Sequence, residues 1–488
     1  MKNYSIWLEG IAKDKYPTLD KDIETDILII GGGITGISTA YHLRKSKLKI
    51  CVVDRGKVGL GISSKTTGKL TYLQDLIYTK LSKQHSCNSL KEYLNSQKDA
   101  IKLVESIIKK HGIDCDYTKQ KSYLFASSVE EINKVKHEQE LLQYLKVKVQ
   151  EEKIPLNLDS NYSISVSDTA YFHPIKYINS LAKICSQDGI EIYENSKITN
   201  IEKDKDIYVC TSGKNTITCK KVILACHYPF FVFPFVFPLK GHLERSYISA
   251  SKVLENKTIS GINVSKNTKS FRYHNDKLNN YLIYLSGSHS LAFKYNAKEN
   301  FSKLVDEVYG LKIKPEFIWS NIDIITNDYL PYIGLIEDNL YIGTGYNTWG
   351  MTNGSIAGKI LSDLVLGKEN KYVKLFDPKR GSSSVSSIIE DVFSSAKPFL
   401  SNKIIKNKTF YSDKVIFAKK DGKNIAIYID NDGKKHIVYN KCPHLKCSLI
   451  FNEVEKTWDC PCHASRFDLD GNVIEGPSCY NISYNKEI

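Results

Sequence analysis

Two short segments near the C-terminus combine cysteine with histidine, the residue types that hold a redox metal. They are Cys442-x-His444 and, after fifteen intervening residues, Cys460-x-x-His463. Two thiolates and two imidazoles at this spacing suit a [2Fe–2S] centre in which two histidines replace two cysteines on one iron. Zinc is the alternative, but zinc motifs more often pair C-x2-C with H-x3–5-H. The spacing therefore predicts a [2Fe–2S] cluster on these four residues.

The uneven distribution of cysteine agrees with a local metal chemistry. The chain has 488 residues and 12 cysteines, and five of these cysteines lie in its last 47 residues. A small disulfide-knotted secreted fold is excluded by the length and by the scatter of the other seven. The length predicts about three domains. Hydrophobic residues at 42% and charged residues at 25% are ordinary globular values.

The positive charge of the chain does not indicate a nucleic-acid partner. Lys and Arg number 68 against 54 Asp and Glu, a net charge of +14. The lysines are interspersed with Asp, Glu and Asn, without a basic block or a nucleic-acid-binding motif, which is typical of a solvated surface. We expect no nucleic acid among the partners.

Two segments bear on the membrane and on secretion. The N-terminal residues lack the apolar core and cleavage site of a signal peptide. Residues 222–239 are the most apolar stretch, but Pro229, Pro234 and Pro238 would break a spanning helix. This stretch therefore predicts a buried strand followed by a loop rich in proline and phenylalanine. We expect no transmembrane segment and a cytoplasmic location.

Residues 26–55 have the pattern of a strand, a glycine loop, a helix and a second strand. Gly31, Gly33 and Gly36 form G-x-G-x-x-G after an apolar run, and a second apolar run ends in Asp54. This is the βαβ unit that binds a dinucleotide. The glycines permit the turn and the close approach of the pyrophosphate, the helix N-terminus offers N–H groups, and the acid can bind ribose hydroxyls. A glycine-rich turn without a ligand is the alternative.

Together with later motifs, this unit resembles the FAD-dependent amine and amino-acid oxidase superfamily, which includes glycine oxidase, D-amino-acid dehydrogenase and sarcosine oxidase. The later motifs are S-x-x-T-x-G at 63–68, the strand before Cys226, and D-x-L-P-x-x-G followed by G-x-x-x-x-G-M within 328–351. The opening SIWLEG also resembles relatives of gamma-glutamylputrescine oxidase. The resemblance implies that FAD is held by Gly31, Gly33, Ile34, Thr35, Gly36, Asp54, Arg55, Thr66, Thr67, Gly68, Leu70, Ala225, Gly345, Gly350, Met351 and Thr352.

The resemblance also implies the domain organisation. We expect an α/β Rossmann-type FAD-binding domain interleaved with an α+β substrate domain, together spanning residues 1–378, followed by a small all-β Rieske domain at 409–488. Residues 379–408 are expected to be a linker that contains an amphipathic helix. The FAD-binding pieces are expected at about 20–90, 155–235 and 326–378, and the substrate-domain pieces at about 91–154 and 236–325.

The cysteine–histidine loops resemble those of the cytochrome-bc-type Rieske fold. In that fold a second cysteine in each loop binds no iron, and the resemblance implies a disulfide between Cys447 and Cys462. It also implies that Ser465 donates a hydrogen bond to a cluster sulfide and that Gly476-Pro477 belongs to a third loop over the cluster. The remaining C-terminal cysteine, Cys479, is expected to be an ordinary core or surface thiol.

Three positions depart from the usual Rieske pattern. Lys446 and Ala464 stand where glycines are common, and Phe467 stands where a tyrosine often gives its hydroxyl to a ligand sulfur. Losing a hydrogen bond to the cluster lowers its reduction potential. We therefore expect a potential below that of respiratory-chain Rieske centres.

The substrate groups are marked less clearly. Many oxidases of this superfamily have Arg-Pro shortly before the D-x-L-P segment, and that arginine clamps the substrate carboxylate; here Asp323 and Ile324 stand in its place. An arginine fork suits a carboxylate, whereas an aspartate repels one. We expect a cationic amine paired with Asp323, with an ordinary structural hydrogen bond as the alternative. Asp323, Arg272 and His242 are the catalytic candidates, and further substrate-binding candidates, each with a structural alternative, are Arg245, Tyr247, Tyr273 and Tyr284.

These features predict a flavoprotein dehydrogenase that oxidises an amine or amino-acid-like substrate. Electrons are expected to pass from FAD to the [2Fe–2S] cluster and on to an external acceptor. A fused one-electron carrier favours a dehydrogenase over an oxidase, because O2 can take electrons from flavin directly. Two alternatives remain: the reverse flow, in which the cluster feeds the flavin to reduce a substrate, and a redox sensor or electron-transfer module without turnover.

Overall fold

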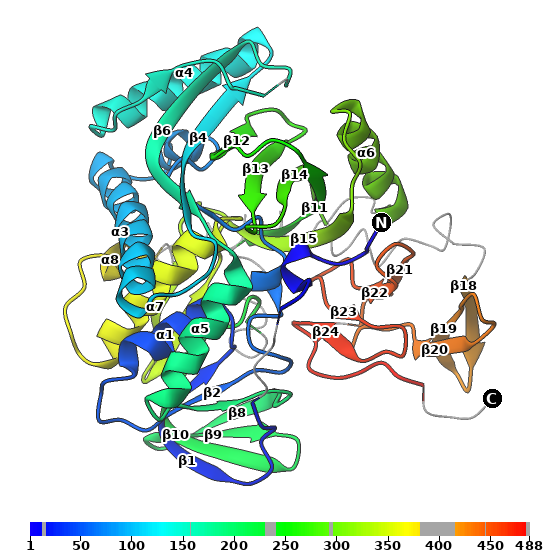
Figure 1. The fold of residues 1–488 in the computed structure, drawn as a ribbon. Coiled ribbons are helices and arrows are strands. Elements are labelled where there is room, and N and C mark those ends of the chain that lie inside the picture. Colours follow the sequence, from blue (N-terminus) through cyan, green and yellow to red (C-terminus); the bar gives the residue numbers. More distant parts are fainter. Residues whose placement is uncertain are drawn as a thin grey trace.

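The computed structural model describes residues 1–11, 16–156, 158–229, 241–291, 296–380, 415–444 and 446–484. Two large sheets precede two small ones (Figure 1). The expected linker helix and residues 230–239 of the apolar loop lie outside the described residues. None of the described helices is both long enough and apolar enough to cross a membrane.

The first large sheet has eight strands and carries the glycine loop. Its β1 strand ends in a buried run, and β1 lies between β10 and β2, both parallel to it. A continuous apolar run is what a strand covered on both faces requires. The order is β16 (Tyr332–Glu337), β17 (Leu340–Thr344), β10 (Asn215–Leu224), β1 (Ile23–Ile30), β2 (Ile50–Val53) and β7 (Glu191–Tyr193); β9 (Ile207–Ser212) pairs with β10, and β8 (Ile198–Asp204) pairs with β9.

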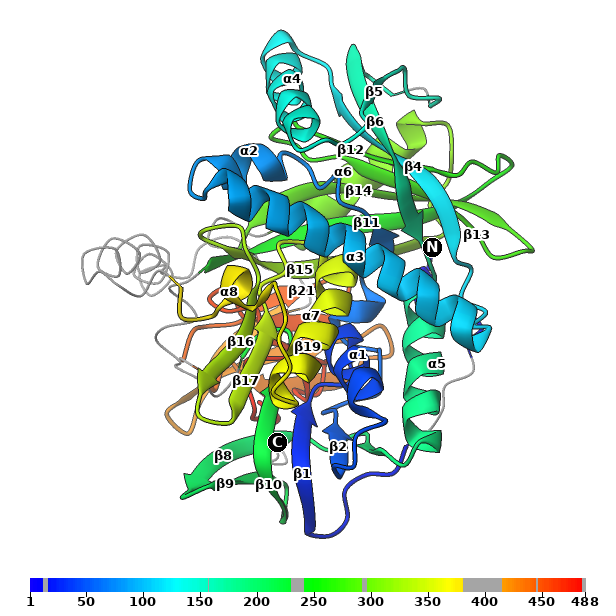
Figure 2. The ribbon, with the colours of Figure 1, turned by 90° about the vertical axis from the view of Figure 1, so that its left-hand side faces the viewer.

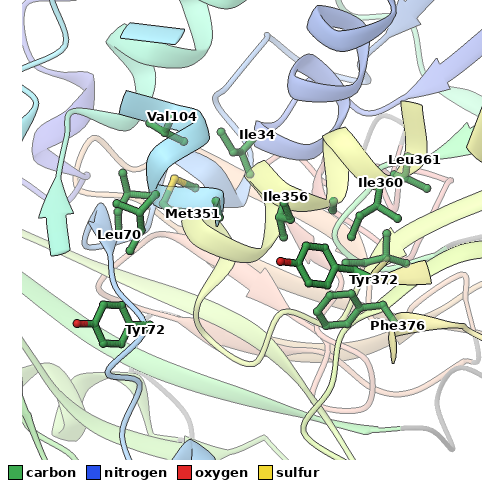
Figure 3. Packing of buried hydrophobic residues seen from close by; sticks show 14 of the residues in the cluster. Ile34, Leu70, Tyr72, Val104, Met351, Ile356, Ile360, Leu361, Tyr372 and Phe376 are labelled. Carbon is green, nitrogen blue, oxygen red and sulfur yellow. The ribbon is translucent and has the colours of Figure 1, made fainter. Parts of the chain in front are cut away.

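Two helices cross at very short range against this sheet. They are α1 (Ile34–Leu43) and α7 (Gly350–Val365), which lie side by side in Figure 2. A Cβ on Gly358 would lie 2.4 Å from the Cβ of Ser38, so only glycine permits this approach. The two helices share a core of aliphatic side chains, part of which Figure 3 shows. Their close contact brings both helix N-termini to one edge of the sheet.

The second large sheet has nine strands and lies over that edge. Its residues alternate between two cores: Leu124 packs with α3 and α4, whereas Tyr123 and Phe125 pack with α6. The strands are β15 (Phe317–Thr326), β11 (Gly241–Val253), β14 (Asn280–Ser290), β13 (Ser270–Asn275), β12 (Ile259–Asn263), β4 (Thr118–Ala126), β6 (Tyr162–Tyr171) and β3 (Lys69–Leu70), with β5 (Gln150–Glu151) beside β6. The helices are α2 (Ile77–Ser82), α3 (Cys87–His111), α4 (Val129–Tyr144) and α6 (Ala297–Gly310).

The place of β6 shifts one expected boundary. Because β6 pairs with β4 and β3, residues up to Tyr171 belong to the second sheet. The chain therefore returns to the first sheet after residue 171 rather than near 155. The following helix, α5 (Pro174–Gln187), packs against α1 beside the first sheet. The short helices are η1 (Ile6–Leu8), η2 (Ile62–Ser64) and α8 (Val373–Phe376).

The C-terminal module consists of two small antiparallel sheets around one core. Asp421 and Gly422 have φ angles of 51° and 72° and join the first two strands, as an Asp-Gly hairpin requires. In Figure 1 the module lies beside β15 and the N-terminal segment. One sheet contains β18 (Val415–Lys420), β19 (Lys423–Ile429) and β20 (Lys435–Tyr439), and the other contains β21 (Ile450–Asn452), β22 (Thr457–Asp459), β23 (Arg466–Phe467) and β24 (Val473–Glu475).

Candidate functional site

One long cavity begins at the glycine loop and ends at the C-terminal module. Gly31 and Asp54 line its first part, and Asp323 lines a part formed by the second sheet. His463 of the C-terminal module lines the same cavity. Residues that the sequence places in three separate motifs therefore face one continuous space.

The glycine loop has the backbone geometry of a phosphate cradle. Gly31 has φ 115°, and a Cβ there would lie 2.6 Å from the carbonyl oxygen of Ala225. A Cβ on Gly36 would lie 1.8 Å from the carbonyl oxygen of Gly31. Helix α1 starts at Gly33 without a side-chain cap, although Ser63 Oγ accepts from the Ile34 amide at 3.1 Å. The remaining first-turn amides are available for an anion.

Asp54 ends β2 and is held by the loops around it. Its carboxylate accepts hydrogen bonds from the Gly32 amide at 2.7 Å and from the Gly56 amide at 2.7 Å. Burial raises the pKa of Asp54 despite these two hydrogen bonds. The carboxylate is thus fixed at the end of the second strand, the position from which an acid reaches ribose hydroxyls.

A second helix N-terminus faces the cavity from α7. Gly350 and Met351 of its first turn line the cavity, and Trp349 provides no side-chain cap. The segment 61–70, part of which lines the same cavity, is held by two indoles. Trp7 Nε1 donates to the Thr66 carbonyl at 2.6 Å, and Trp319 Nε1 donates to the Lys65 carbonyl at 2.9 Å.

The expected FAD residues divide into two groups. Those that line the cavity are Gly31, Gly33, Ile34, Thr35, Asp54, Arg55, Thr66, Ala225, Gly350 and Met351. Those that do not line it are Gly36, Thr67, Gly68, Leu70, Gly345 and Thr352. Lining residues that we did not anticipate include Ser63, Ser196, Lys197, Tyr228, Tyr346 and Thr348. Ser63 stands in the S-x-x-T-x-G motif, Tyr346 and Thr348 stand inside the G-x-x-x-x-G-M motif, and the other three carry no motif.

The donor set of this cavity fits FAD. Two uncapped helix N-termini and the glycine backbone suit a pyrophosphate and an electron-rich ring edge. The carboxylate of Asp54 suits a ribose. FAD would therefore extend from the Asp54 end toward the first turn of α7.

Asp323 lines the cavity and has a second carboxylate as its cross-strand neighbour. It pairs across the strands with Glu244, and Asn321 Nδ2 donates to it at 2.8 Å. Burial first and Glu244 second raise the pKa of Asp323 to about 7. Burial alone would raise the pKa of Glu244, but the hydrogen bond from His242 together with the charges of His242, Lys80 and His289 lowers it. Within the described ranges no ion pair joins Asp323 to a cation.

The other substrate candidates lie away from the cavity. His242 bonds Glu244 at 3.0 Å, and its side chain is 49% exposed. Arg272 is fully buried between the rings of Trp7 and Tyr171, and its guanidinium has no hydrogen-bond partner in the part of the chain that the structure describes. Burial lowers the pKa of Arg272 to about 9. The three tyrosines Tyr247, Tyr273 and Tyr284 bond His289, Glu255 and Glu307 respectively.

The four expected cluster ligands come together in the C-terminal module. The thiols of Cys442 and Cys460 are within hydrogen-bonding range of each other. The rings of His444 and His463 lie 5.1 Å apart, and His444 Nδ1 is buried without a partner among the described residues. Burial lowers the pKa of His463 to about 4, so its ring is neutral as a metal ligand requires. This set of two sulfurs and two nitrogens fits a [2Fe–2S] cluster.

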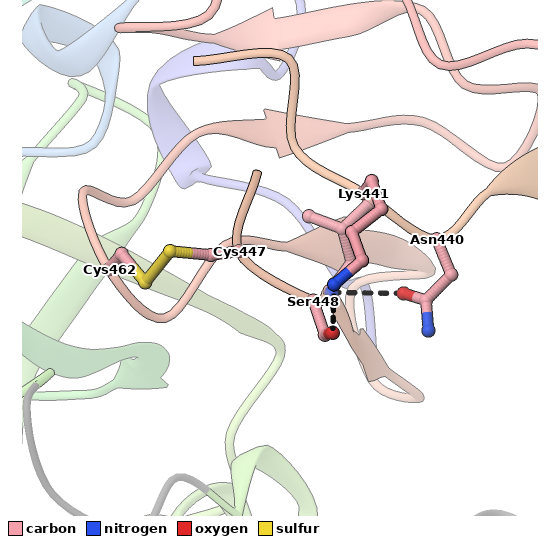
Figure 4. The surroundings of a disulfide bond; sticks show 6 residues. Asn440, Lys441, Cys447, Ser448 and Cys462 are labelled. Carbon is pink, nitrogen blue, oxygen red and sulfur yellow. Dashed lines mark hydrogen bonds between the residues drawn. A yellow bond between two sulfur atoms is a disulfide. The ribbon is translucent and has the colours of Figure 1, made fainter. Parts of the chain in front are cut away.

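A disulfide joins the two cluster loops. It links Cys447 and Cys462 (Figure 4). The Cys460 sulfur lies within 4.8 Å of both of its sulfurs. Lys446 and Ala464, which replace common glycines, have φ angles of 61° and 60°. The left-handed conformation at both positions is the one that glycine adopts without strain.

Ser465 lies at the base of the third loop. Its hydroxyl oxygen accepts a hydrogen bond from the Ser478 amide at 3.0 Å. The hydroxyl proton can still be given to a second acceptor. The same loop brings Cys479 to the wall of the long cavity, so this thiol lies at the boundary between the two parts of the molecule.

Phe467 permits a test of the expected low reduction potential. It is fully buried in the core that contains Cys442 and Cys460. Phe467→Tyr should raise the potential by about 40 mV, equivalent to roughly 1 kcal/mol of hydrogen bonding to a ligand sulfur. Protein-film voltammetry would measure it, with Phe451→Tyr in the same domain as a control. A wild-type potential at or above that of respiratory-chain Rieske centres would contradict the expectation.

Fold and site together define a flavoprotein oxidoreductase with an iron–sulfur module. Residues 26–364 match the family model "FAD dependent oxidoreductase", and residues 401–484 match "Rieske [2Fe-2S] domain". The chain belongs to the FAD dependent oxidoreductase family and carries a C-terminal Rieske domain. The predicted fold class, FAD and the [2Fe–2S] cluster are thereby confirmed.

One relative covers nearly the whole chain, and two other proteins cover about three quarters of it. The Rieske 2Fe-2S iron-sulfur protein YhfW of Bacillus subtilis (strain 168) is 31% identical over 97% of this chain and 95% of its own. Gamma-glutamylputrescine oxidoreductase of Escherichia coli (strain K12) is 22% identical over 73% of this chain and 87% of its own. The crystal structure of glycine oxidase from Geobacillus kaustophilus superposes with a TM-score of 0.61 at 18% identity, covering 73% of this chain and 99% of that one.

Proposed function

We propose that this enzyme oxidises an amine or amino-acid-like substrate and delivers the electrons through the Rieske cluster to an external acceptor. The observation that carries the proposal is the shared cavity. Gly31 and Gly350, at the two helix N-termini, and His463, an expected cluster ligand, line one continuous space. A Rieske cluster beside the cavity that we assign to FAD is well placed to accept electrons from the flavin.

The chemistry is divided between two cofactors and the protein. FAD supplies two-electron chemistry and the cluster supplies one-electron transfer. The amine gives up two electrons and two protons to become an imine, and a one-electron acceptor outside the chain takes the electrons in turn. The protein's own part is to bind the amine, orient it and receive a proton.

Asp323 is the group that we assign to binding. Asp323 lines the cavity, its cross-strand neighbour Glu244 adds a second carboxylate beside it, and two acidic groups at one place favour a cation. Tyr228 lines the same cavity, and its ring lies 6.3 Å from that of His463. The names of the relatives, gamma-glutamylputrescine oxidoreductase and glycine oxidase, support amines and amino acids as the substrate class.

Anaerobic reduction with a panel of amines tests the proposal. The holoprotein is mixed with diamines, monoamines and α-amino acids, while flavin absorbance is recorded and samples are frozen for EPR. We expect a cationic amine to bleach the flavin first and the Rieske EPR signal to follow. If a reduced protein partner reduces the cluster and then the flavin, while no amine reduces the flavin, electrons flow in the reverse direction. If no substrate is turned over in either direction, the sensor alternative holds.

A further inference from the structure

The contact between the Rieske domain and the rest of the chain holds six charged side chains, four of them buried and two half-buried. We call them the interdomain ion cluster. It contains three cations and three anions, so its formal charges balance. Lys65 and Arg245 come from the flavoprotein part, and Glu455, Asp459, Arg466 and Glu475 come from the Rieske domain.

Arg466 is the centre of this ion cluster. Its Nε lies 3.1 Å from Asp459 Oδ1, its Nη2 lies 3.0 Å from Glu455 Oε2, and its Nη1 lies 3.2 Å from Glu475 Oε1. From the other side, Arg245 Nη1 lies 2.9 Å from Asp459 Oδ2, and the Lys65 ammonium pairs with Glu475. The flavoprotein part thus completes a network that the Rieske domain begins.

The carboxylates of Glu455 and Asp459 are screened from water and are stabilised as charges, whereas burial and the neighbouring Arg466 lower the pKa of Lys65 well below its usual value. Arg245 is 1% exposed and Asp459 is 4% exposed. Burial alone would raise the pKa of Asp459, but Arg466 and Arg245 hold it well below its usual value. Removing one partner of a buried ion pair leaves a charge without compensation, which is strongly unfavourable. Separation of the two domains is therefore expected to depend on Arg245.

Further hydrogen bonds cross the same interface. Ser320 Oγ donates to Glu455 Oε2 at 2.6 Å, and the Ser320 amide donates to Glu455 Oε1 at 3.2 Å. Asn3 Nδ2 donates to the Val454 carbonyl at 3.0 Å. Because β15 and the N-terminal segment both contact the Rieske domain, the docked position is defined by several separate elements.

The chain that follows Glu475 covers one end of the long cavity. Residues 476–479 line it together with Arg55 and Lys197. A Cβ on Gly476 would lie 3.1 Å from Arg55 Nη1. Since Arg55 follows Asp54, this is the end at which we place the ribose of FAD. Glu475, a member of the ion cluster, therefore immediately precedes the covering segment 476–479.

We propose that the docked Rieske domain is a structural part of the FAD site, with residues 476–479 as its cover and the interdomain ion cluster as the lock that keeps FAD bound. FAD enters and leaves when this interface separates. The inference does not depend on the direction of electron flow or on the identity of the substrate.

The rate of FAD release from the full-length holoprotein tests this proposal. Released FAD is followed by its rise in fluorescence after dilution. We expect Arg245→Met to release FAD at least about tenfold faster than wild type, because about 1.4 kcal/mol of lost stabilisation already gives that factor. Arg245→Lys, which keeps the charge, should fall between the two. Lys277→Met, which breaks an exposed pair with Asp114, should release FAD at the wild-type rate.

Hydrogen exchange separates docking from retention. In Arg245→Met, exchange at residues 476–479 and 196–198 should rise together, while the Rieske EPR signal stays intact. If exchange rises but FAD release keeps its wild-type rate, the Rieske domain does not retain FAD and the proposal is overturned. If Arg245→Met does not fold, the double variant Lys65→Met with Glu475→Gln removes one charge from each side, and an unchanged release rate in it overturns the proposal equally.

Discussion

Replacing His463 by alanine should abolish the Rieske EPR signal while amine-driven bleaching of the flavin persists. The reason is that His463 is one of two imidazoles in the expected ligand set, and a site with three ligands leaves one iron open to solvent. His463 lines the same cavity, but the glycine loop after β1, Asp54 after β2 and the first turn of α7, to which we assign FAD, are left unchanged by this substitution. Turnover with a one-electron acceptor should fall by about 100-fold or more, because substitutions around metal sites lower metal affinity or activity by up to about 100-fold.

A second histidine of the same domain provides the matched control. His436 is buried in β20 and bonds Asp470 at 2.8 Å and Asp430 at 3.2 Å, with no part in the ligand set. His436→Asn should keep the EPR signal and most of the turnover. Loss of flavin bleaching in His463→Ala, with folding intact by circular dichroism, would show that electrons do not reach the flavin before the cluster.

Asp323→Asn is expected to weaken amine binding strongly. A hydrogen bond to a charged group contributes about 1.5–3 kcal/mol, so the KM of a cationic amine should rise roughly 10- to 100-fold. An uncharged substrate analogue should lose much less. Anaerobic stopped-flow reduction of the flavin over a range of amine concentrations measures the effect, since it separates binding from the rate of bleaching. An unchanged KM would leave Asp323 with a purely structural hydrogen bond to Asn321.

The pH profile gives this prediction a second, independent readout. The pKa of Asp323 is raised to about 7, and only the ionised carboxylate attracts a cation. The value of kcat/KM should therefore rise as pH increases through about 7 and level off above it. Asp323→Asn should lose this limb of the profile. Glu244→Gln is the informative control. Removing this neighbouring negative charge should lower the pKa of Asp323 and move the rise in kcat/KM to lower pH.

The sequence alone was sufficient for the local chemistry of both cofactors. Gly31, Gly33 and Gly36 are close in the chain, and their meaning depends on a single turn and one helix. Cys442 and His444, and likewise Cys460 and His463, lie in short loops whose spacing restricts the metal that they can bind. These motifs can be recognised from sequence because the backbone geometry of a few consecutive residues positions the groups that bind each cofactor.

The tertiary structure alone decided what the two sites share. Arg245 was a substrate candidate by sequence, but it pairs with Asp459, 214 residues further along the chain. Cys479 was expected to be an ordinary thiol, but it lines the FAD cavity. The role of a buried charge or a cavity-lining residue depends on which residues folding places next to it. Those residues are distant in sequence, so no local pattern predicts them. The sequence therefore identified the two cofactors, and the packing of the domains determined that they face a common space.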